Sequence, residues 1–221
     1  MNNSEILSHI DHTLLKATST WAEIKELCEE AIQYNTASVC VPPTFVKRIC
    51  DTYGEQLCVC AVIGFPLGYH DKEVKVAELL KAKADGAREF DMVVNLGDVK
   101  DSAFDKVLEE IQSLKGAAGS QILKVIIETC YLTEREKIAL CDCVTAGSAD
   151  YIKTSTGFGT AGAVLDDIKL FKAHIGPNVK IKAAGGVRTR EDLEMFLTEG
   201  CDRIGTSSAV KLLSGETSDT Y

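Results

Sequence analysis

The chain alternates short apolar runs with longer amphipathic stretches. The apolar runs are rich in Val, Ile and Cys and are bounded by Gly, Pro or Asn, which is typical of buried strands. Strands are predicted at residues 9–14, 37–41, 57–63, 89–95, 122–128, 150–153, 179–184 and 203–205. Apolar residues recur at helical spacing in the stretches between these runs, so the pattern predicts that strands and helices alternate.

Several of the intervening stretches begin with helix-start signals. Ser19 or Thr20 can cap a helix, and Pro43 fits the first turn of the next one. Thr133 and Glu136 have the spacing of a capping box. Helices are predicted at 2–8, 21–34, 43–53, 71–84, 101–117, 133–146, 163–174 and 190–199, with a last one beginning near Ser207 or Ser208.

A glycine or asparagine precedes seven of the predicted strands. These residues tolerate the left-handed conformation with which helices often end: Asn35, Gly54, Gly86, Gly119, Gly147, Gly176 and Gly200. Regular strand–helix units imply right-handed crossovers and a parallel sheet. Eight units in about 200 residues favour one α/β domain, a (β/α)₈ barrel of the TIM type with a short N-terminal helix. We expect this barrel at residues 1–213 and a flexible tail at 214–221.

A doubly wound open sheet is the alternative architecture. Against it, no Gly-x-Gly-x-x-Gly segment follows the first predicted strand, as a dinucleotide-binding fold of that kind would require.

Composition excludes several classes of function. The net charge is −9 without a Lys/Arg-rich run, so we expect no nucleic-acid partner. No apolar stretch approaches the roughly 20 residues that span a bilayer, and the N-terminus lacks the features of a signal peptide. Nine cysteines, an odd number, indicate reduced thiols and a cytoplasmic protein. Neither the cysteines nor the four histidines have convincing ligand spacing, so no metal site is predicted.

Polar residues at the carboxyl ends of the strands are the candidates for chemistry, because barrels of this type carry their active sites there. The candidates are Asp11, Asp91, Asn95, Lys124, Glu128, Lys153 and Lys182. Lys153 and Lys182 lie on consecutive strands, so two ammonium groups would approach each other inside the barrel. Each would disfavour protonation of the other, which would leave one amine free to form a Schiff base.

Two other interpretations of these charges are open. They could form a salt-bridge network that fills the barrel, and Lys153 could be a strand-end lysine that extends to solvent. Burying several charges is costly without a function, which favours a catalytic site.

Glycine-rich loops follow the last three predicted strands. Barrels that act on phosphorylated substrates bind the phosphate in loops of this kind after the seventh and eighth strands. The predicted phosphate-binding residues are Gly157, Gly159, Gly185, Gly186, Arg188, Gly205, Ser207 and Ser208.

Four segments resemble the deoxyribose-phosphate aldolases of the short bacterial type. They are EFDMV (89–93), LKVIIET (123–129), YIKTSTGF (151–158) and KAAGGVR (182–188). The resemblance extends over nearly the whole chain. It implies reversible cleavage of 2-deoxy-D-ribose 5-phosphate to D-glyceraldehyde 3-phosphate and acetaldehyde, in deoxyribonucleotide catabolism. It also implies a class I aldolase that uses no cofactor and forms a homodimer or homotetramer.

The resemblance also assigns roles to individual residues. Lys153 is expected to form the Schiff base, and Asp91 to donate and accept a proton through a water. Lys182 would lower the pKa of Lys153 and relay protons. Lys124 and Asp11 would support the site. Some members of the family use a terminal tyrosine in proton transfer, so Tyr221 is a further candidate.

Two other functions are open at this point. One is a different Schiff-base or phosphosugar barrel, such as a transaldolase-like enzyme or an epimerase. The other is an inactive barrel that only binds a phosphosugar. The presence of Asp91, Lys153 and Lys182 argues against the inactive barrel.

Overall fold

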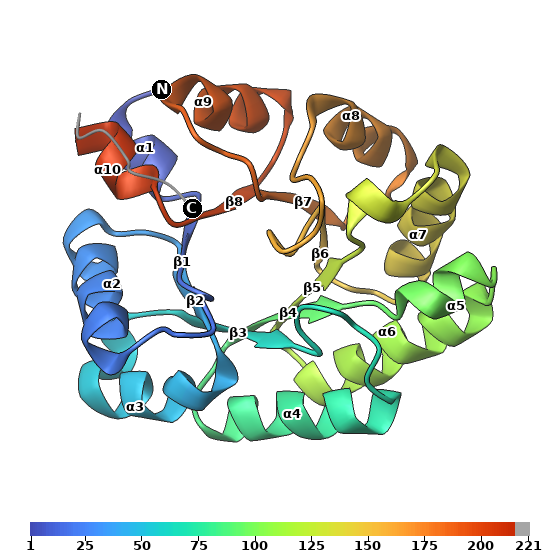
Figure 1. The fold of residues 1–221 in the computed structure, drawn as a ribbon, viewed down its shortest axis with the longest axis horizontal. Coiled ribbons are helices and arrows are strands. Elements are labelled where there is room, and N and C mark those ends of the chain that lie inside the picture. Colours follow the sequence, from blue (N-terminus) through green and yellow to red (C-terminus); the bar gives the residue numbers. More distant parts are fainter. Residues whose placement is uncertain (215–221) are drawn as a thin grey trace.

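Residues 1–214, which the computed structural model describes, form a closed barrel of parallel strands (Figure 1). The strands are β1 (Ile10–Thr13), β2 (Ser38–Val41), β3 (Val59–Ile63), β4 (Glu89–Val93), β5 (Ile122–Ile126), β6 (Tyr151–Lys153), β7 (Lys180–Ala184) and β8 (Arg203–Thr206). Each strand pairs with the next in sequence, and β1 closes the barrel by pairing with β8. The predicted barrel is therefore confirmed, and the open sheet is excluded.

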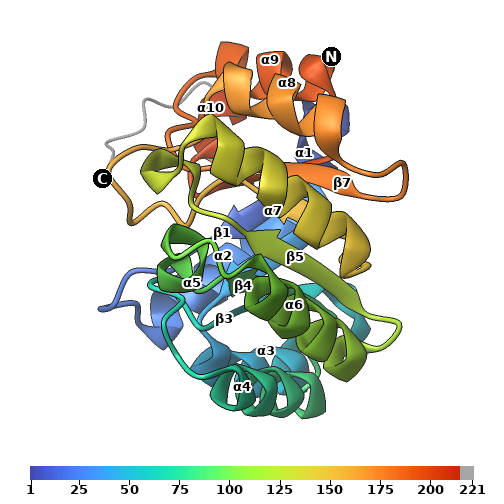
Figure 2. The ribbon, with the colours of Figure 1, turned by 90° about the vertical axis from the view of Figure 1, so that its right-hand side faces the viewer.

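Helices surround the barrel and cover the outer face of the sheet (Figure 1). They are α1 (Asn3–Leu7), α2 (Trp21–Tyr34), α3 (Pro43–Tyr53), α4 (Lys72–Ala84), α5 (Leu96–Lys100), α6 (Phe104–Ala118), α7 (Glu134–Ala146), α8 (Leu165–His174), α9 (Arg190–Glu199) and α10 (Ala209–Ser214). Two 3₁₀ turns, η1 (Gly54–Gln56) and η2 (Thr129–Tyr131), complete the secondary structure of the described chain. Figure 2 shows α4, α6 and α7 side by side along one flank.

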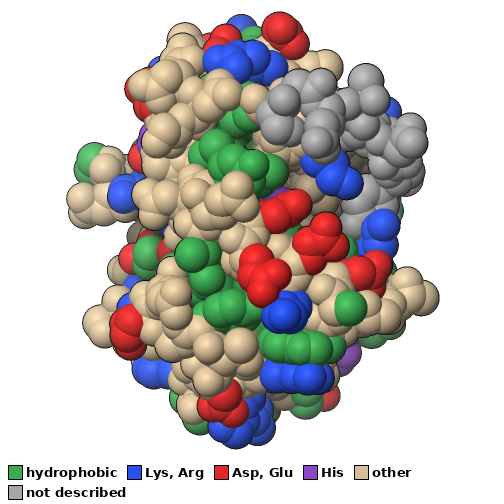
Figure 3. Space-filling model, turned by 90° about the vertical axis from the view of Figure 1, so that its left-hand side faces the viewer, with side chains coloured by type: hydrophobic (Ala, Val, Ile, Leu, Met, Phe, Trp, Pro, Cys, Tyr) green, Lys and Arg blue, Asp and Glu red, His purple; other side chains and the backbone are tan. Residues whose placement is uncertain are grey.

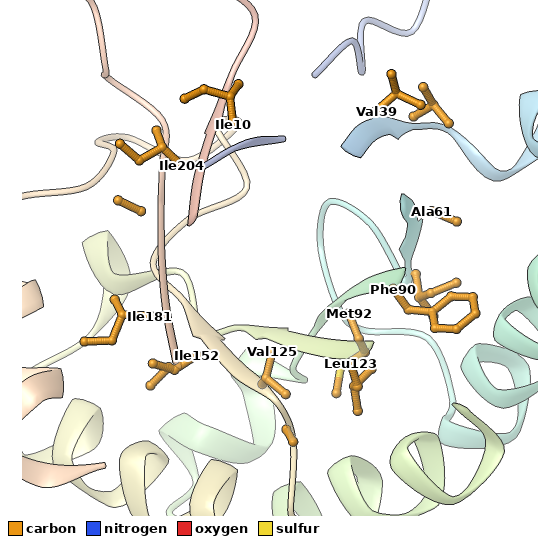
Figure 4. Packing of buried hydrophobic residues seen from close by; sticks show 14 of the residues in the cluster. Ile10, Val39, Ala61, Phe90, Met92, Leu123, Val125, Ile152, Ile181 and Ile204 are labelled. Atoms are coloured by element: carbon orange, nitrogen blue, oxygen red, sulfur yellow. The ribbon is translucent and has the colours of Figure 1, made fainter. Parts of the chain in front are cut away.

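The hydrophobic core lies between the sheet and the helices. Residues such as Val39, Phe90 and Val125 point outward from their strands and are fully buried (Figure 4). Full burial of each such side chain contributes about 1.5–3 kcal/mol relative to exposure. Because successive strand residues point to opposite faces, the residues between them face the interior of the barrel.

Helix capping follows the sequence closely at two positions. Thr20 and Thr133 each cap a helix, and a glutamate three residues later completes a capping box in both cases. The prediction at Thr133 and Glu136 is confirmed.

Two of the seven predicted left-handed helix ends are wrong. Gly147 has a φ of −75°, and Ser148 adopts the left-handed conformation in its place. Gly176 also lacks a positive φ. A Cβ atom would lie 2.4 Å from Ile111 Cγ2 at Gly147 and 2.4 Å from Thr145 Cγ2 at Gly176. These two glycines therefore permit close packing instead of a left-handed turn.

Two strands end earlier than the sequence predicts. Asn95, placed by the sequence at the end of β4, instead caps the short helix α5, which the sequence did not reveal. Glu128, placed at the end of β5, instead adopts a left-handed conformation ahead of η2. In both cases the chain leaves the strand for a short helix or 3₁₀ turn, which the apolar pattern of a strand does not predict.

Charged side chains of both signs are interspersed over the face of the molecule that Figure 3 shows. None of the helices within residues 1–214 is long and apolar enough to cross a membrane.

Candidate active site

The two predicted lysines meet inside the barrel at one carboxylate. Lys153 of β6 and Lys182 of β7 are register partners, and both side chains are buried. Asp91 Oδ2, from β4, lies 2.6 Å from Nζ of Lys153 and 2.6 Å from Nζ of Lys182. The expected proximity of the two amines is therefore confirmed, and Asp91 bridges them.

Lys124 and Asp11 complete the predicted group. Lys124 Nζ lies 2.9 Å from Asp91 Oδ1 and 3.4 Å from Asp11 Oδ2. Asp11 Oδ2 also accepts a short hydrogen bond from Lys182 Nζ. Five of the candidates, drawn from five different strands, thus form one continuous network.

The network includes two charged residues that were not among the candidates. Glu89 Oε2 lies 2.6 Å from Lys124 Nζ. Arg203 Nη1 lies 2.5 Å from Asp11 Oδ1 and 3.3 Å from Glu89 Oε2. Both could have been found from strand alternation, since Glu89 shares a face with Asp91 and Arg203 is the register partner of Lys182.

Small polar side chains also contact the carboxylates. Ser38 Oγ donates to Asp11 Oδ1 at 2.7 Å. Cys60 Sγ lies 3.1 Å from Asp91 Oδ1, and Cys40 Sγ lies 3.8 Å from Asp91 Oδ2. The two thiols reach these positions because Cys40 and Cys60 are register partners on β2 and β3.

The network fixes the charge of Asp91 and of Lys182. Burial alone would raise the pKa of Asp91, but Lys124, Lys153 and Lys182 hold it well below the usual range. Burial alone would lower the pKa of Lys182, but Asp11 and Asp91 raise it. Asp91 is therefore an anion and Lys182 a cation at neutral pH.

Thiols and carboxylates lie close enough together to hold a metal ion. Cys40, Cys60 and Asp91 form one such group, and Asp11, Cys60 and Glu89 form another. Lys and Arg side chains already occupy the carboxylate oxygens of both groups. A cation would have to displace these partners, so the donor set fits an ion-pair network better than a metal centre.

Two candidates lie outside the network. Asn95 Oδ1 accepts from the backbone N–H of Gly97 at 3.0 Å. Asn95 also borders a hollow of about 320 Å³ beside α4 and α6, on the outside of the barrel. Glu128 bonds to Thr156 in the loop that follows β6. The prediction that Asn95 points into the barrel is therefore wrong.

The glycines of the predicted phosphate region have two structural functions. Gly185 and Gly186 both have positive φ, 77° and 75°. A Cβ at Gly205 would lie 3.1 Å from Lys182 Cε, so this glycine leaves room for the buried lysine. Gly157 also has a positive φ, and Gly159 packs against Glu128.

The polar residues of that region differ in exposure. Ser207 and Arg188 are exposed, whereas Ser208 is buried and its hydroxyl lies 3.1 Å from Thr206 Oγ1. Tyr221 and most of the predicted tail lie outside the described residues.

Comparison with known proteins identifies the family. The model of the DeoC/LacD family aldolases matches residues 6–212. The chain belongs to this family. It is 65% identical over its whole length to all of the deoxyribose-phosphate aldolase of Clostridium botulinum strain Alaska E43. Over 216 residues it is 53% identical to the Clostridioides difficile enzyme of that name, with 98% of this chain and 99% of that protein covered.

A solved structure extends this similarity to the fold. The chain superposes on the tetrameric deoxyribose phosphate aldolase of Aeropyrum pernix with a TM-score of 0.90 and 31% identity. The match covers 97% of this chain and 92% of that one. The network of charged side chains therefore lies inside the barrel of an aldolase family member.

Proposed function

We propose that the chain cleaves 2-deoxy-D-ribose 5-phosphate reversibly to D-glyceraldehyde 3-phosphate and acetaldehyde, with Lys153 as the Schiff-base residue. The observation that carries this proposal is the position of the Lys153 and Lys182 ammonium groups on one oxygen of Asp91. A buried lysine beside another cation can supply a neutral amine, as imine formation requires.

The charge count favours Lys153 over its neighbours as that amine. Lys124, Lys153, Lys182 and Arg203 supply four cations to the network, and Asp11, Glu89 and Asp91 supply three carboxylates. Loss of one proton makes the network neutral. Lys124 and Lys182 each bond to at least two carboxylates, whereas the Lys153 ion pair is with Asp91.

The reaction follows from these positions. The Lys153 amine adds to C1 of the open-chain sugar and loses water to give an iminium ion. The iminium accepts the electron pair of the C2–C3 bond as the C3 hydroxyl loses its proton to Asp91 through a water. Glyceraldehyde 3-phosphate leaves, and C1 and C2 remain on Lys153 as an enamine. Protonation at C2, relayed by Lys182 and Asp91, and hydrolysis then release acetaldehyde.

Lys124 and Asp11 act on these groups without touching the substrate. Lys124 holds Asp91 through Oδ1, which leaves Oδ2 directed at the two amines. Asp11 neutralises Lys182 in part and fixes its side chain.

Aldehyde release combined with chemical trapping tests the proposal. The protein should release acetaldehyde from deoxyribose 5-phosphate, and borohydride in the presence of acetaldehyde should leave a stable adduct on Lys153. Such an adduct would also distinguish the aldolase from an epimerase that works by acid–base chemistry alone. Peptide mapping of the adduct to Lys182 or Lys124 would show that the nucleophile is assigned wrongly.

The substrate phosphate is proposed to bind the loops after β6, β7 and β8. Gly157, Gly159, Gly185, Gly186, Arg188, Gly205, Ser207 and Ser208 are the residues of this proposal. Backbone N–H groups at positive-φ glycines can approach an anion closely. Ser207→Asp, at an exposed position, should raise KM for deoxyribose 5-phosphate and leave unphosphorylated deoxyribose unaffected. Equal losses for both substrates would place the phosphate elsewhere.

Tyr221 is proposed as a proton relay for the enamine carbon. Its deletion should slow deuterium exchange into the methyl group of acetaldehyde while borohydride trapping continues. An unchanged exchange rate would remove the residue from the mechanism.

The cytoplasm and a homodimer or homotetramer are proposed as the setting of the enzyme. All nine cysteines are free thiols, which suits a reducing compartment. The relative from Aeropyrum pernix is tetrameric. Sedimentation velocity would decide the assembly, and a monomer at all concentrations would contradict the proposal.

A further inference from the structure

Glu128 combines a strained backbone with a buried charge. Its φ of 53° and ψ of 65° lie in the left-handed region, where a side chain with a Cβ is disfavoured. The other non-glycine residues with positive φ in the described chain are Asn35, Ser102 and Ser148, which are short, polar and exposed at helix ends. Glu128 is long and only 2% exposed, so helix termination does not explain its conformation.

The carboxylate of Glu128 binds one residue of the loop after β6 through both of its oxygens. Oε1 accepts from the backbone N–H of Thr156 at 3.1 Å, and Oε2 accepts a short hydrogen bond from Thr156 Oγ1. Thr156 Oγ1 in turn accepts from the backbone N–H of Phe158 at 3.0 Å. The carboxylate thus binds Thr156 directly and is linked to Phe158 through the Thr156 hydroxyl.

Further contacts join this loop to its surroundings. A Cβ at Gly159 would lie 3.2 Å from Glu128 Cδ, so the loop packs directly on the carboxylate. The ring of Phe158 makes an edge-on contact with the ring of Phe65, at 5.4 Å between centroids, in the loop after β3. Glu128 and Thr156 therefore connect the segments that follow β5 and β6, and Phe158 connects the latter with the loop after β3.

The loop that Glu128 binds lies next to the proposed catalytic and phosphate-binding residues. Thr156 lies three residues after Lys153, and Gly157 and Gly159 belong to the proposed phosphate region. The backbones of the two segments also pair, since Ile127 N donates to Lys153 O at 3.1 Å.

We infer that Glu128 is a positioning residue that holds residues 154–159 in the conformation that receives the substrate phosphate. The inference rests on the proposed function. With this left-handed backbone, the Glu128 carboxylate reaches Thr156 in the loop after β6 and binds it through both oxygens. Burial raises the pKa of Glu128, and the hydrogen bonds from Thr156 oppose that rise.

Steady-state kinetics of three variants tests the inference. Glu128→Gln keeps the shape but removes the charge, so the charge-assisted bond from Thr156 Oγ1 is replaced by a weaker, neutral one in which the amide donates to the hydroxyl. Thr156→Val removes the hydroxyl, and Thr156→Ser retains it. Glu128→Gln and Thr156→Val should each lower kcat/KM for deoxyribose 5-phosphate by roughly 10–100-fold, because small displacements of positioning groups have effects of that size. The loss for unphosphorylated deoxyribose should be much smaller, and Thr156→Ser should behave like the parent protein.

A matched control separates this effect from loss of a buried carboxylate in general. Asp167 of α8 is also buried and bonds to Lys137 at 2.5 Å, away from the network inside the barrel. Asp167→Asn should leave the ratio of kcat/KM for the two substrates unchanged. The double variant Glu128→Gln/Thr156→Val should lose little more than the stronger single variant, since both act on the same contact between residue 128 and Thr156 Oγ1.

Three outcomes would overturn the inference: unchanged kcat/KM in the Glu128 and Thr156→Val variants, equal losses for both substrates, or additive losses in the double variant. If Glu128→Gln does not fold, Thr156→Val carries the same test. Failure of the proposed function would be visible in the parent protein, which would then cleave neither substrate.

Discussion

Within residues 1–214, lysines are buried in two places, inside the barrel and between α4, α6 and the end of β4. The outer lysine, Lys75, bonds to Glu110 Oε1 at 2.6 Å and to the backbone carbonyl of Val93 at 2.8 Å. One cation thus meets one carboxylate and one dipole, and all of its partners are fixed. Inside the barrel, four cations share three carboxylates, and two ammonium groups share a single oxygen of Asp91. The outer pair is a closed structural unit, whereas the inner network has one proton more than its carboxylates can balance.

Electrostatics separates the two places in the same way. Burial lowers the pKa of Lys75 and raises that of Glu110, and neither partner fully offsets the burial of the other. Inside the barrel, the attraction of the carboxylates outweighs the effect of burial, so the pKa of Lys124 is raised well above its ordinary value. A buried lysine alone is therefore no sign of catalysis, and what distinguishes the barrel is the number of cations around each carboxylate.

The largest effect is expected from removing the nucleophile. Lys153→Met should reduce turnover roughly 10⁴-fold or more, as removal of a nucleophile does in other enzymes. Asp91 keeps Lys124 and Lys182 as partners, so the fold should survive with little loss. Acetaldehyde release and thermal unfolding measure the two effects. Retained turnover would place the catalytic amine elsewhere.

The second effect concerns the neighbouring amine. Lys182→Leu removes the cation that shares Asp91 Oδ2 with Lys153, together with a proton relay. Turnover should fall by roughly 10²–10⁴-fold, the range of general acid–base groups. The pH–rate profile should shift as well. A profile identical to that of the parent protein would show that Lys182 serves only the packing of the barrel.

The third effect should appear in stability and leave the chemistry intact. Lys75→Met leaves Glu110 as a buried carboxylate without its cation, which should cost about 3–5 kcal/mol in the free energy of unfolding. The double variant Lys75→Met/Glu110→Gln should lose much less free energy of unfolding, because no unpaired charge then remains buried. Denaturant titration gives the free energies, and kcat per folded molecule should not change. A loss of kcat in the double variant would mean that the outer pair also shapes the site.

Much of the contrast between the barrel interior and the outer ion pair could be predicted from the sequence. The part that could not be predicted has a physical cause. Strand alternation placed Asp91, Lys124, Lys153 and Lys182 on the inner face, because the period of a strand is fixed by its backbone. The pairing of Lys75 with Glu110 could not be predicted, since it depends on the packing of two helices against each other.

The contacts around Asp91 could not be predicted from the sequence either. Which amines share its Oδ2 depends on the register of strands that close into a barrel. The left-handed conformation of Glu128 was hidden for a different reason: its stabilising partner, Thr156, lies 28 residues away in sequence. Local propensity therefore favoured an extended continuation of the strand.

The smallest effect is expected in the loss of stability at acidic pH. This loss can be compared directly between the network inside the barrel and the outer pair of Lys75 and Glu110. The pKa values of Asp11 and Asp91 are lowered in the fold, so their stabilising contribution is present above about pH 4, the range in which aspartate titrates in an unfolded chain. It is lost as the pH falls further toward their folded pKa values, at about 1.4 kcal/mol per group and pH unit.

The parent protein and the variant Lys75→Met/Glu110→Gln should therefore lose stability in parallel below pH 4. Asp11→Asn, although less stable at neutral pH, should show a shallower decline, because one of the responsible carboxylates is absent. Denaturant titrations at several pH values between about 3 and 6, a range that brackets the pKa of aspartate in an unfolded chain, would measure the slopes. If the outer double variant flattened the decline instead, the acid sensitivity would arise outside the barrel and the contrast between the two places would be reversed.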